Sequence, residues 1–248
     1  SLSIEYKGHE GFVRTLAVDR SGQYLLSGSD DGWVKIWEVM TGRCLKSWNL
    51  EGIVKWVEWC PSASLSLVLV AMDCRVYLLN AHVGDLLVCA KTDALLQDFE
   101  RGDYIESERV KTTVSWKEMS EEELLHKQGF RWVLEHFKPV SQARFHGKGD
   151  YFATLMPEGA NRSVLISQIS KRRSQLPFTK SKGLVQCVEF HPIKPYLFVA
   201  TQRHVRIYDL MKQSLLKKLM TNSKWISSIA IHPLGDNLLV GTYDRKVL

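Results

Sequence analysis

Apolar and polar positions alternate along most of the chain with the period of two that is typical of β-strands. Five segments share one order: an apolar strand, a turn with Gly or His-Pro, a second apolar strand, and then Val-x-Ile/Leu opening a third. The first strands begin at Val13, Val54, Val140, Val185 and Ile226. The third strands begin at Val34, Val76, Val164, Val205 and Val247. The pattern therefore predicts five copies of one small antiparallel sheet.

The spacing of these copies indicates the architecture. Successive third strands are 42, 88, 41 and 42 residues apart, and the long interval equals one repeat plus an insertion of about 46 residues. A repeat of about 40–45 residues with four short strands is typical of a β-propeller blade. One blade leaves both faces of its sheet uncovered, so neighbouring blades have to stack around a common axis. The sequence therefore predicts an all-β propeller.

We expect a single incomplete propeller with about four and a half blades. The expected blades cover residues 8–50, 51–91, 139–180, 181–222 and 223–248, the last only in part, and the insertion covers residues 92–138. Propellers of the WD-repeat type usually close with seven blades, and an open arc would expose two sheet edges. We therefore expect this chain to be part of a longer one.

The first repeat carries the WD-repeat signature, with Gly8-His9 followed by LLSGSDDGWVKIW. In WD repeats four such side chains form a hydrogen-bonded chain that ties the turns of the blade together. Here these structural residues are His9, Ser27, Asp31 and Trp37. Later repeats replace Trp-Asp by Leu79-Asn80, Ser167-Gln168 and Tyr208-Asp209. We therefore expect blades two and three to be held mainly by packing.

The insertion between blades two and three is expected to be partly helical. It should follow an outer strand formed by GDLLVCAK, residues 84–91, and lie on the face where the loops between blades gather. Ser120 and Glu123 match a capping box, and Met119 and Leu124 match a hydrophobic staple. These residues predict a helix from Glu121 to about Gln128, stopped by Gly129. A solvated acidic loop and a docking element for a protein both remain open for this segment.

The overall composition is ordinary, but the charge is distributed unevenly along the chain. The chain is 45% hydrophobic and 24% charged, as ordinary globular proteins are. Its net charge of +6 is unevenly spread. Residues 1–91 hold 9 Lys/Arg and 10 Asp/Glu, residues 92–137 hold 6 and 11, and residues 138–248 hold 18 and 6. The excess of +12 in the last part favours a polyanionic partner.

A cluster of cations within that basic part is the candidate RNA-binding site. Its members are Lys171, Arg172, Arg173, Lys180 and Lys182. The guanidinium groups of Arg172 and Arg173 have the planar shape that suits phosphates. A solvated turn and a nuclear-import signal are the alternatives for the same residues.

Two loops of blades four and five form the candidate protein-binding site. Gln202-Arg203-His204 replaces the usual Asp-Gly turn of a blade, and Lys224-Trp225 leads into the next one. Trp and Arg are common anchors of protein interfaces, so Arg203, Lys224 and Trp225 are predicted to contact a protein. Trp225 is equally consistent with the first core residue of its strand.

Motifs for catalysis are absent from the sequence. It has no GxSxG elbow, no Walker phosphate loop and no HExxH pair. Five cysteines are scattered without CxxC spacing, which argues against a zinc cluster and a disulfide framework. No apolar run approaches the roughly 20 residues of a membrane span. We therefore expect no catalytic residue, metal, cofactor, small-molecule substrate or membrane.

Several segments are more specific than a general WD repeat. RRSQLPF, TQRHVRIYDL and GSDDGWVKIWEVMTGRC closely resemble the block-of-proliferation (Bop) family, called Erb in fungi, and the resemblance extends from Gly8 to Leu248. It implies a non-catalytic scaffold for large ribosomal subunit assembly and pre-rRNA processing, located in the nucleolus and nucleoplasm. It also implies a trimeric complex with Pescadillo and a second WD-repeat protein, bound to the pre-60S particle and pre-rRNA. The alternative is a WD-repeat adaptor that recognises peptides in a ubiquitin-ligase or chromatin complex.

Overall fold

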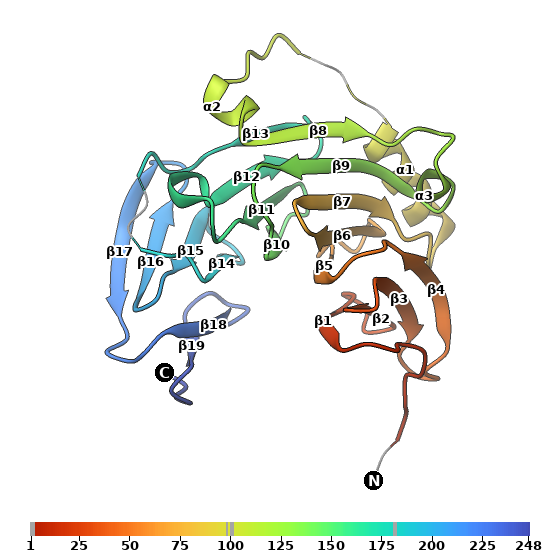
Figure 1. Cartoon of the computed structure of the whole chain (residues 1–248), viewed down its shortest axis with the longest axis horizontal. Helices are drawn as coiled ribbons and strands as arrows, with labels where there is room; N and C mark the ends of the chain where they lie inside the picture. Colours follow the sequence, from red (N-terminus) through yellow and green to blue (C-terminus); the bar gives the residue numbers. More distant parts are fainter. Residues whose placement is uncertain (1–2, 98, 100–101, 181–182) are drawn as a thin grey trace.

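The strands of the described residues form five antiparallel sheets that follow one another along an arc (Figure 1). The computed structural model describes residues 3–97, 99, 102–180 and 183–248. Each sheet is one blade, and its strands lie in sequence order except in blade two. The fold is a partial WD-type β-propeller, as the repeat spacing predicts.

The strand bounds follow the predicted repeats closely in four of the five blades. Blade one consists of β1 (Val13–Val18), β2 (Tyr24–Ser29), β3 (Trp33–Glu38) and β4 (Cys44–Asn49). Blade three consists of β10 (Gln142–Phe145), β11 (Tyr151–Leu155), β12 (Val164–Gln168) and β13 (Arg173–Gln175). Blade four consists of β14 (Cys187–Phe190), β15 (Tyr196–Ala200), β16 (His204–Asp209) and β17 (Ser214–Met220). The last sheet pairs β18 (Ile226–Ile231) with β19 (Leu238–Thr242).

Blade two differs from the prediction in its outer part. Its first three strands are β5 (Val54–Trp59), β6 (Leu67–Met72) and β7 (Arg75–Asn80). Its fourth strand is β9 (Phe130–His136), and β8 (Val114–Glu118) adds a fifth at the edge. The insertion therefore enters between the third and fourth strands of blade two, and the expected boundary of this blade at residue 91 is wrong.

The segment GDLLVCAK, expected to be the outer strand, belongs instead to helix α1 (Leu86–Gln97). The Asp85 carboxylate accepts a hydrogen bond of 2.6 Å from the Leu87 N–H, which satisfies a donor of the first turn. Cys89, Thr92 and Leu96 are buried at helical spacing against blade two. A short apolar run such as LLVCA fits a strand and a buried helix equally well, which explains the error.

The helix predicted within the insertion, from Glu121 to about Gln128, is present but shorter. Helix α3 covers Leu124–Lys127, after a single-turn helix α2 at Glu108–Lys111. Met119 is buried as the staple requires, but Leu124 is 69% exposed and Leu125 packs against the core instead. Gly129 has a φ of +106°, and a Cβ there would collide with the Asn80 carbonyl oxygen. The stop at Gly129 is therefore a steric requirement.

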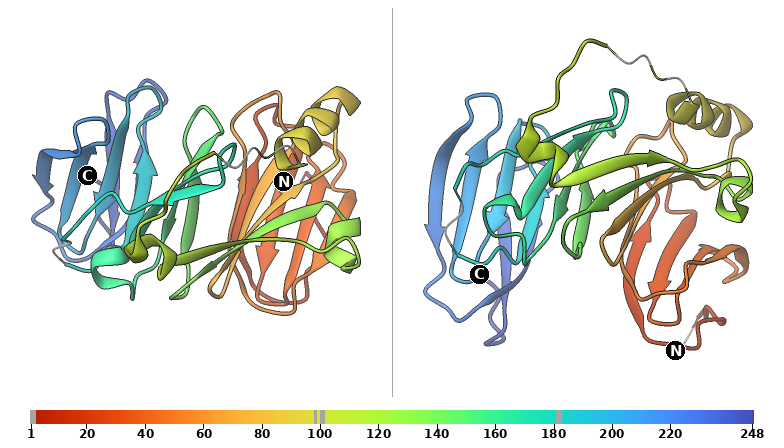
Figure 2. Two further views of the ribbon diagram at one scale, coloured as in Figure 1. Left: turned by 90° about the horizontal axis from the view of Figure 1, so that it is seen from above. Right: turned by 45° about the horizontal axis from the view of Figure 1, so that its top comes forward.

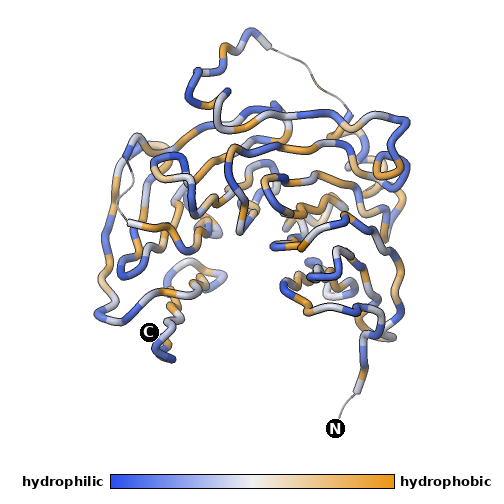
Figure 3. The backbone as a smooth tube through the Cα atoms, viewed as in Figure 1, coloured by the Kyte–Doolittle hydropathy of each residue, from blue (hydrophilic) through white to orange (hydrophobic). Residues whose placement is uncertain are grey.

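Hydrophobic residues concentrate along the strands (Figure 3), and buried apolar side chains form clusters between the blades. Each pair of neighbouring sheets encloses its own cluster, so every inner blade contributes to two clusters. Trp48 of blade one and Phe130 of blade two meet edge to face, with ring centroids 5.7 Å apart. The blades are thus held to their neighbours by stacked apolar faces.

Polar side chains also connect the inner strands of neighbouring blades. The Thr15 hydroxyl accepts a hydrogen bond of 3.1 Å from the Val57 N–H. The Gln142 side-chain oxygen accepts one of 3.2 Å from the Val188 N–H, and the Glu58 carboxylate accepts one from the Phe145 N–H. Each bond satisfies a backbone donor that the sheets themselves leave free.

The predicted hydrogen-bonded chain of blade one is present. The Trp37 indole donates to the Ser27 hydroxyl at 2.8 Å, and the His9 ring contacts Ser27 at 2.7 Å and Asp31 at 3.0 Å. Burial raises the pKa of Asp31, but hydrogen bonds from the Trp33 N–H, His9 and the Glu10 N–H outweigh it and lower the pKa to about 2. Asp31 therefore remains an ionised acceptor at neutral pH.

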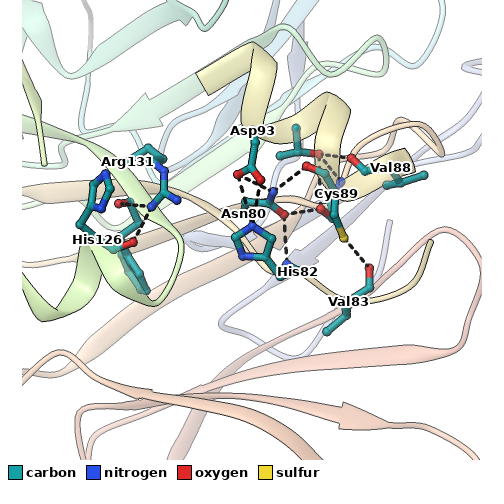
Figure 4. A network of polar contacts seen from close by, with 11 residues as sticks. Asn80, His82, Val83, Val88, Cys89, Asp93, His126 and Arg131 are labelled. Atoms are coloured by element: carbon teal, nitrogen blue, oxygen red, sulfur yellow. Dashed lines mark hydrogen bonds and ion pairs between the residues drawn. The ribbon is translucent and has the colours of Figure 1, made fainter. Parts of the chain in front are cut away.

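Blade two has a polar network of its own, so the expectation that mainly packing holds it needs correction (Figure 4). Asn80 replaces the Asp of the signature and is fully buried. Its amide nitrogen donates to the Cys89 carbonyl oxygen and to Asp93, both at 2.9 Å. Its amide oxygen accepts from the His82 N–H at 3.0 Å and from the Ser66 hydroxyl. The network fastens α1 to the end of β7.

Candidate nucleic-acid interface

The predicted RNA-binding arginines are engaged inside the chain. Arg172 is only 7% exposed, and its guanidinium donates to the Leu95 carbonyl oxygen at 2.8 Å and to the Ile169 carbonyl oxygen. The same group lies 4.9 Å from the centroid of the Trp132 ring. Burial lowers the pKa of Arg172. Its side chain is therefore closed to phosphates, and its assignment to the RNA site is wrong.

Arg172 is one of four arginines, which we call the arginine clamp, that join the insertion to blade three. The members are Arg109, Arg162, Arg172 and Arg173. Arg109 of α2 donates to the carbonyl oxygens of Phe178 at 2.9 Å and Asn161 at 3.0 Å. Arg173 lies 4.2 Å from the centroid of the Tyr104 ring. Figure 2 shows α2 beside blade three, where the clamp holds it.

Lysines of the predicted cluster remain accessible. Lys171 and Lys180 are exposed, whereas Lys182 lies outside the described residues. Arg172 and Arg173, in contrast, contact aromatic rings of the insertion. Arg172 also donates to the carbonyl oxygen of Leu95, which lies 77 residues earlier in the sequence. The charge run alone contains no information about those partners.

The outer half of blade four carries a stronger concentration of positive charge. Residues 203–225 contain six Lys/Arg and one Asp/Glu. Lys217 and Lys218 are exposed on the outer strand β17, and Arg206 of β16 lies directly opposite Lys218. Burial and then the charges of Lys218, Arg206 and Arg203 lower the pKa of His204. We call Arg206, Lys212, Lys217 and Lys218 the basic band.

Sequence reasoning missed the basic band, although a signal for it was present. The pair Lys217-Lys218 stands within SLLKKLM, in the part of the chain with a charge excess of +12. All of β17 except Leu219 is exposed. An outer strand needs few apolar contacts, so its charges are free to face solvent.

The candidate protein-binding residues lie on two loops that a backbone hydrogen bond connects. The Ile226 N–H donates to the Gln202 carbonyl oxygen at 2.9 Å, which joins the two loops. Arg203 and Lys224 are exposed, and Trp225 is 48% exposed. Trp225 precedes β18, so its interpretation as the first core residue of that strand is wrong. We call Arg203, Lys224 and Trp225 the loop cluster.

Three half-buried ionisable side chains, Glu58, Arg144 and Glu189, lie on the inner strands of three successive blades. Arg144 of β10 contacts Glu189 of β14 at 3.3 Å and lies 4.8 Å from the Trp56 ring centroid. Burial raises the pKa of Glu58 to about 8, although the Arg144 charge opposes this. Burial also raises the pKa of Glu189. These groups stand at matching positions of successive repeats, which indicates a role in holding blades together.

Two further features of the described residues bear on the site. They contain no group of three or more His, Cys, Asp or Glu side chains arranged to hold a metal ion. None of their helices has the length and apolar character needed to cross a membrane.

Comparison with known proteins supports the predicted fold and resemblance. The family model "WD domain, G-beta repeat" matches residues 1–38 and 213–248. Proteins named "Ribosome biogenesis protein BOP1 homolog" match 99% of this chain, at 57% identity in Drosophila grimshawi and 54% in Culex quinquefasciatus. The chain spans 31% and 28% of those relatives, about a third of their length. The WD-repeat fold and the resemblance to the block-of-proliferation family are thus confirmed.

Proposed function

We propose that this chain, given its confirmed resemblance to the block-of-proliferation family, is the propeller part of a non-enzymatic scaffold for large ribosomal subunit assembly. The observation that carries the proposal is the 54–57% identity, over 99% of the chain, to relatives named as ribosome biogenesis proteins. The scaffold works in the nucleolus and nucleoplasm. Within the pre-60S particle it forms a trimeric complex with Pescadillo and a second WD-repeat protein.

The basic band supports direct contact with pre-rRNA. Lysine and arginine side chains that neutralise phosphates release counterions, so they supply affinity without reading sequence. Three members of the band, Arg206, Lys217 and Lys218, lie on the regular strands β16 and β17, which keep these charges at fixed spacing. Lys212 lies in the turn between the two strands. Exposed Lys171 and Lys180 add to the same contact from blade three. A pre-formed surface lowers the ordering cost of binding.

The loop cluster supports docking of the second WD-repeat protein. An exposed tryptophan flanked by an arginine and a lysine has the composition of an interface anchor. The loop cluster lies on the segments that precede β16 and β18, whereas Lys217 and Lys218 lie on β17, so the two partners can bind different parts of this region. Trp225→Ala should remove the WD-repeat partner from an affinity purification while leaving recovery of pre-rRNA unchanged. Loss of both the WD-repeat protein and pre-rRNA would contradict the assignment of separate surfaces to the two partners.

The scaffold proposal is tested by purifying the tagged parent protein from growing cells and probing the eluate for large-subunit pre-rRNA. Recovery of pre-rRNA at moderate salt supports it. An eluate of folded protein without pre-rRNA would overturn it and favour the peptide-binding adaptor.

The RNA contact is tested with Lys217→Ala/Lys218→Ala. Log affinity for single-stranded RNA should fall less steeply with log salt, by about 0.7 for each phosphate that is no longer neutralised. Lys46→Ala is the matched control because Lys46 is exposed on β4, the equivalent outer strand of blade one. An equal effect of the control, or an unchanged slope in the double variant, would remove the basic band from the interface.

A further inference from the structure

A groove of about 310 Å³ lies between blades three and four. One wall is the segment that follows β13, residues 175–180, and the other is the turn between β16 and β17, residues 208–215. Nothing in the established resemblance assigns a role to this groove. Its position next to Lys180 and the start of β17 makes it continuous with the basic surface described above.

Two aromatic rings form the apolar part of the groove. Phe178 and Tyr208 lie with ring centroids 4.1 Å apart and ring planes inclined by 39°, and both side chains are half-buried. Half-buried rings that line an open groove offer a flat apolar surface to a ligand. Nucleobases stack on such surfaces regardless of sequence because every base has a π-face.

The remaining groups of the groove are polar or positively charged. Gln175 and Gln213 are exposed, and their amides carry both the donors and the acceptors that the edges of bases require. Lys180 is exposed at the rim, and Lys212 precedes Gln213 in the turn. Asp209 is buried, and its Oδ1 accepts hydrogen bonds from the N–H groups of Met211 at 2.9 Å and Lys212 at 3.0 Å. Charge and hydrogen-bonding capacity therefore both suit a nucleotide.

The insertion holds one wall of the groove in place. Arg109 donates to the Phe178 carbonyl oxygen at 2.9 Å, so the clamp fixes the backbone that carries the aromatic ring. Ser107 caps α2 by accepting from the Val110 N–H, which in turn positions Arg109. Fixing the wall before binding removes part of the ordering cost.

We propose that this groove binds one unstacked nucleotide of single-stranded RNA. The base lies against Phe178 and Tyr208, the glutamine amides meet its edge, and Lys180 neutralises the adjacent phosphate. The proposal rests on the RNA contact of the proposed function and adds that the contact is to single strands. In a duplex the bases are stacked and paired, so they cannot enter the groove.

The test uses fluorescence anisotropy with labelled oligouridine of about ten nucleotides, within the range of single-strand sites. Phe178→Leu should weaken binding about tenfold without changing the salt slope, because it removes stacking and keeps every charge. Lys180→Gln should lower the slope by about 0.7. Tyr151→Leu is the matched control, since Tyr151 is a 38% exposed aromatic residue of blade three outside the groove. An RNA duplex of equal length should compete poorly.

A second measurement avoids any effect of the substitutions on folding. RNA that contains 4-thiouridine is cross-linked by light to the unaltered chain, and the attached peptides are identified by mass spectrometry. Cross-links within residues 175–180 and 208–213 support the groove. Cross-links elsewhere, or equal competition by the duplex, overturn it while leaving the RNA contact intact. Failure of the unaltered chain to bind oligouridine at about 50 mM salt would instead refute the RNA contact itself.

Discussion

At the scale of single residues, arginine serves mainly as an internal connector on blade three. The clamp pairs guanidinium groups with backbone carbonyl oxygens and with aromatic faces, two kinds of partner that lysine satisfies less well. Arg172 combines both kinds and is buried. Lys171 next to it is exposed. Adjacent cations in one run thus have opposite roles, one structural and one available for binding.

Replacing Arg172 by Ala should lower the free energy of unfolding by about 2–4 kcal/mol, because two carbonyl oxygens lose their donor and the space beside Trp132 is left empty. The salt slope of RNA binding should not change. Urea unfolding and anisotropy measure the two effects. Lys171→Ala is the control and should change the stability by less than about 0.5 kcal/mol. A stable Arg172→Ala chain with a reduced salt slope would return Arg172 to the RNA site.

Buried His136 should make the stability depend on pH. Burial lowers its pKa to about 4, and its ring contacts the Thr154 hydroxyl at 2.9 Å. Between that value and the ordinary value of 6.5 the unfolded chain binds the proton and the native chain does not, so stability falls as pH falls. The loss is about 1.4 kcal/mol for each pH unit below 6.5. Urea unfolding at several pH values should show a shallower dependence for His136→Gln, and parallel curves would contradict this assignment.

At the scale of elements, the insertion changes the outer strands of blade two but leaves the order of the blades intact. Blade two keeps three regular strands, while β9 takes the fourth position and β8 extends the sheet towards blade three. The Trp116 indole of β8 donates to the Ser174 hydroxyl at 2.9 Å, and Ser174 contacts Ser167 at 2.8 Å. A tryptophan from the insertion thus joins β8 to the outer strand β13 of blade three.

Asn80 should be as important for blade two as the signature residues are for blade one. Asn80→Leu leaves Ser66 and the Cys89 carbonyl oxygen without their partner in a buried site, so we expect a loss of about 2–4 kcal/mol. Hydrogen exchange in α1 should also become faster. Gln168→Ala, at the matching and more exposed position of blade three, should cost less than about 1 kcal/mol. Similar losses for both variants would show that Asn80 has no special role.

An element could be predicted from the sequence when the residues that determine its structure lie close together in the chain. The alternating strands were predictable because the period of two and the turns lie within a few residues of one another. Helix α1 was not, because its apolar residues fit both periods and its partner Asn80 lies outside the helix. The burial of Arg172 was not predictable either, since its partner Trp132 comes from a strand 40 residues earlier in the chain. Exposed Lys217 and Lys218 could have been identified from the sequence.

At the scale of the whole molecule, the two ends of the arc differ in net charge. The parts before residue 138 carry net charges of −1 and −5, and the part from 138 onwards carries +12. Neighbouring blades share apolar clusters and inner-strand hydrogen bonds, so a ligand on blade four meets a firmly held surface.

Hydrogen exchange measured by mass spectrometry should show that RNA binds the positively charged part of the arc. Oligouridine should slow exchange in residues 175–180 and 203–220, where the groove and the basic band lie. Exchange in residues 24–49 of blade one should not change. Uniform protection along the arc would mean that RNA binds without preference for its basic half.

The order of strands in blade two has a consequence for synthesis of the chain. Strand β7 ends at Asn80 and its partner β9 begins at Phe130, so 49 residues separate them. At about 5–20 residues per second, translation leaves the edge of β7 open for roughly 2–10 seconds. Apart from Arg75, every residue of β7 is buried in the folded blade, including Val76, Leu78 and Leu79. The nascent chain therefore leaves the edge of an aggregation-prone strand unpaired until β9 emerges.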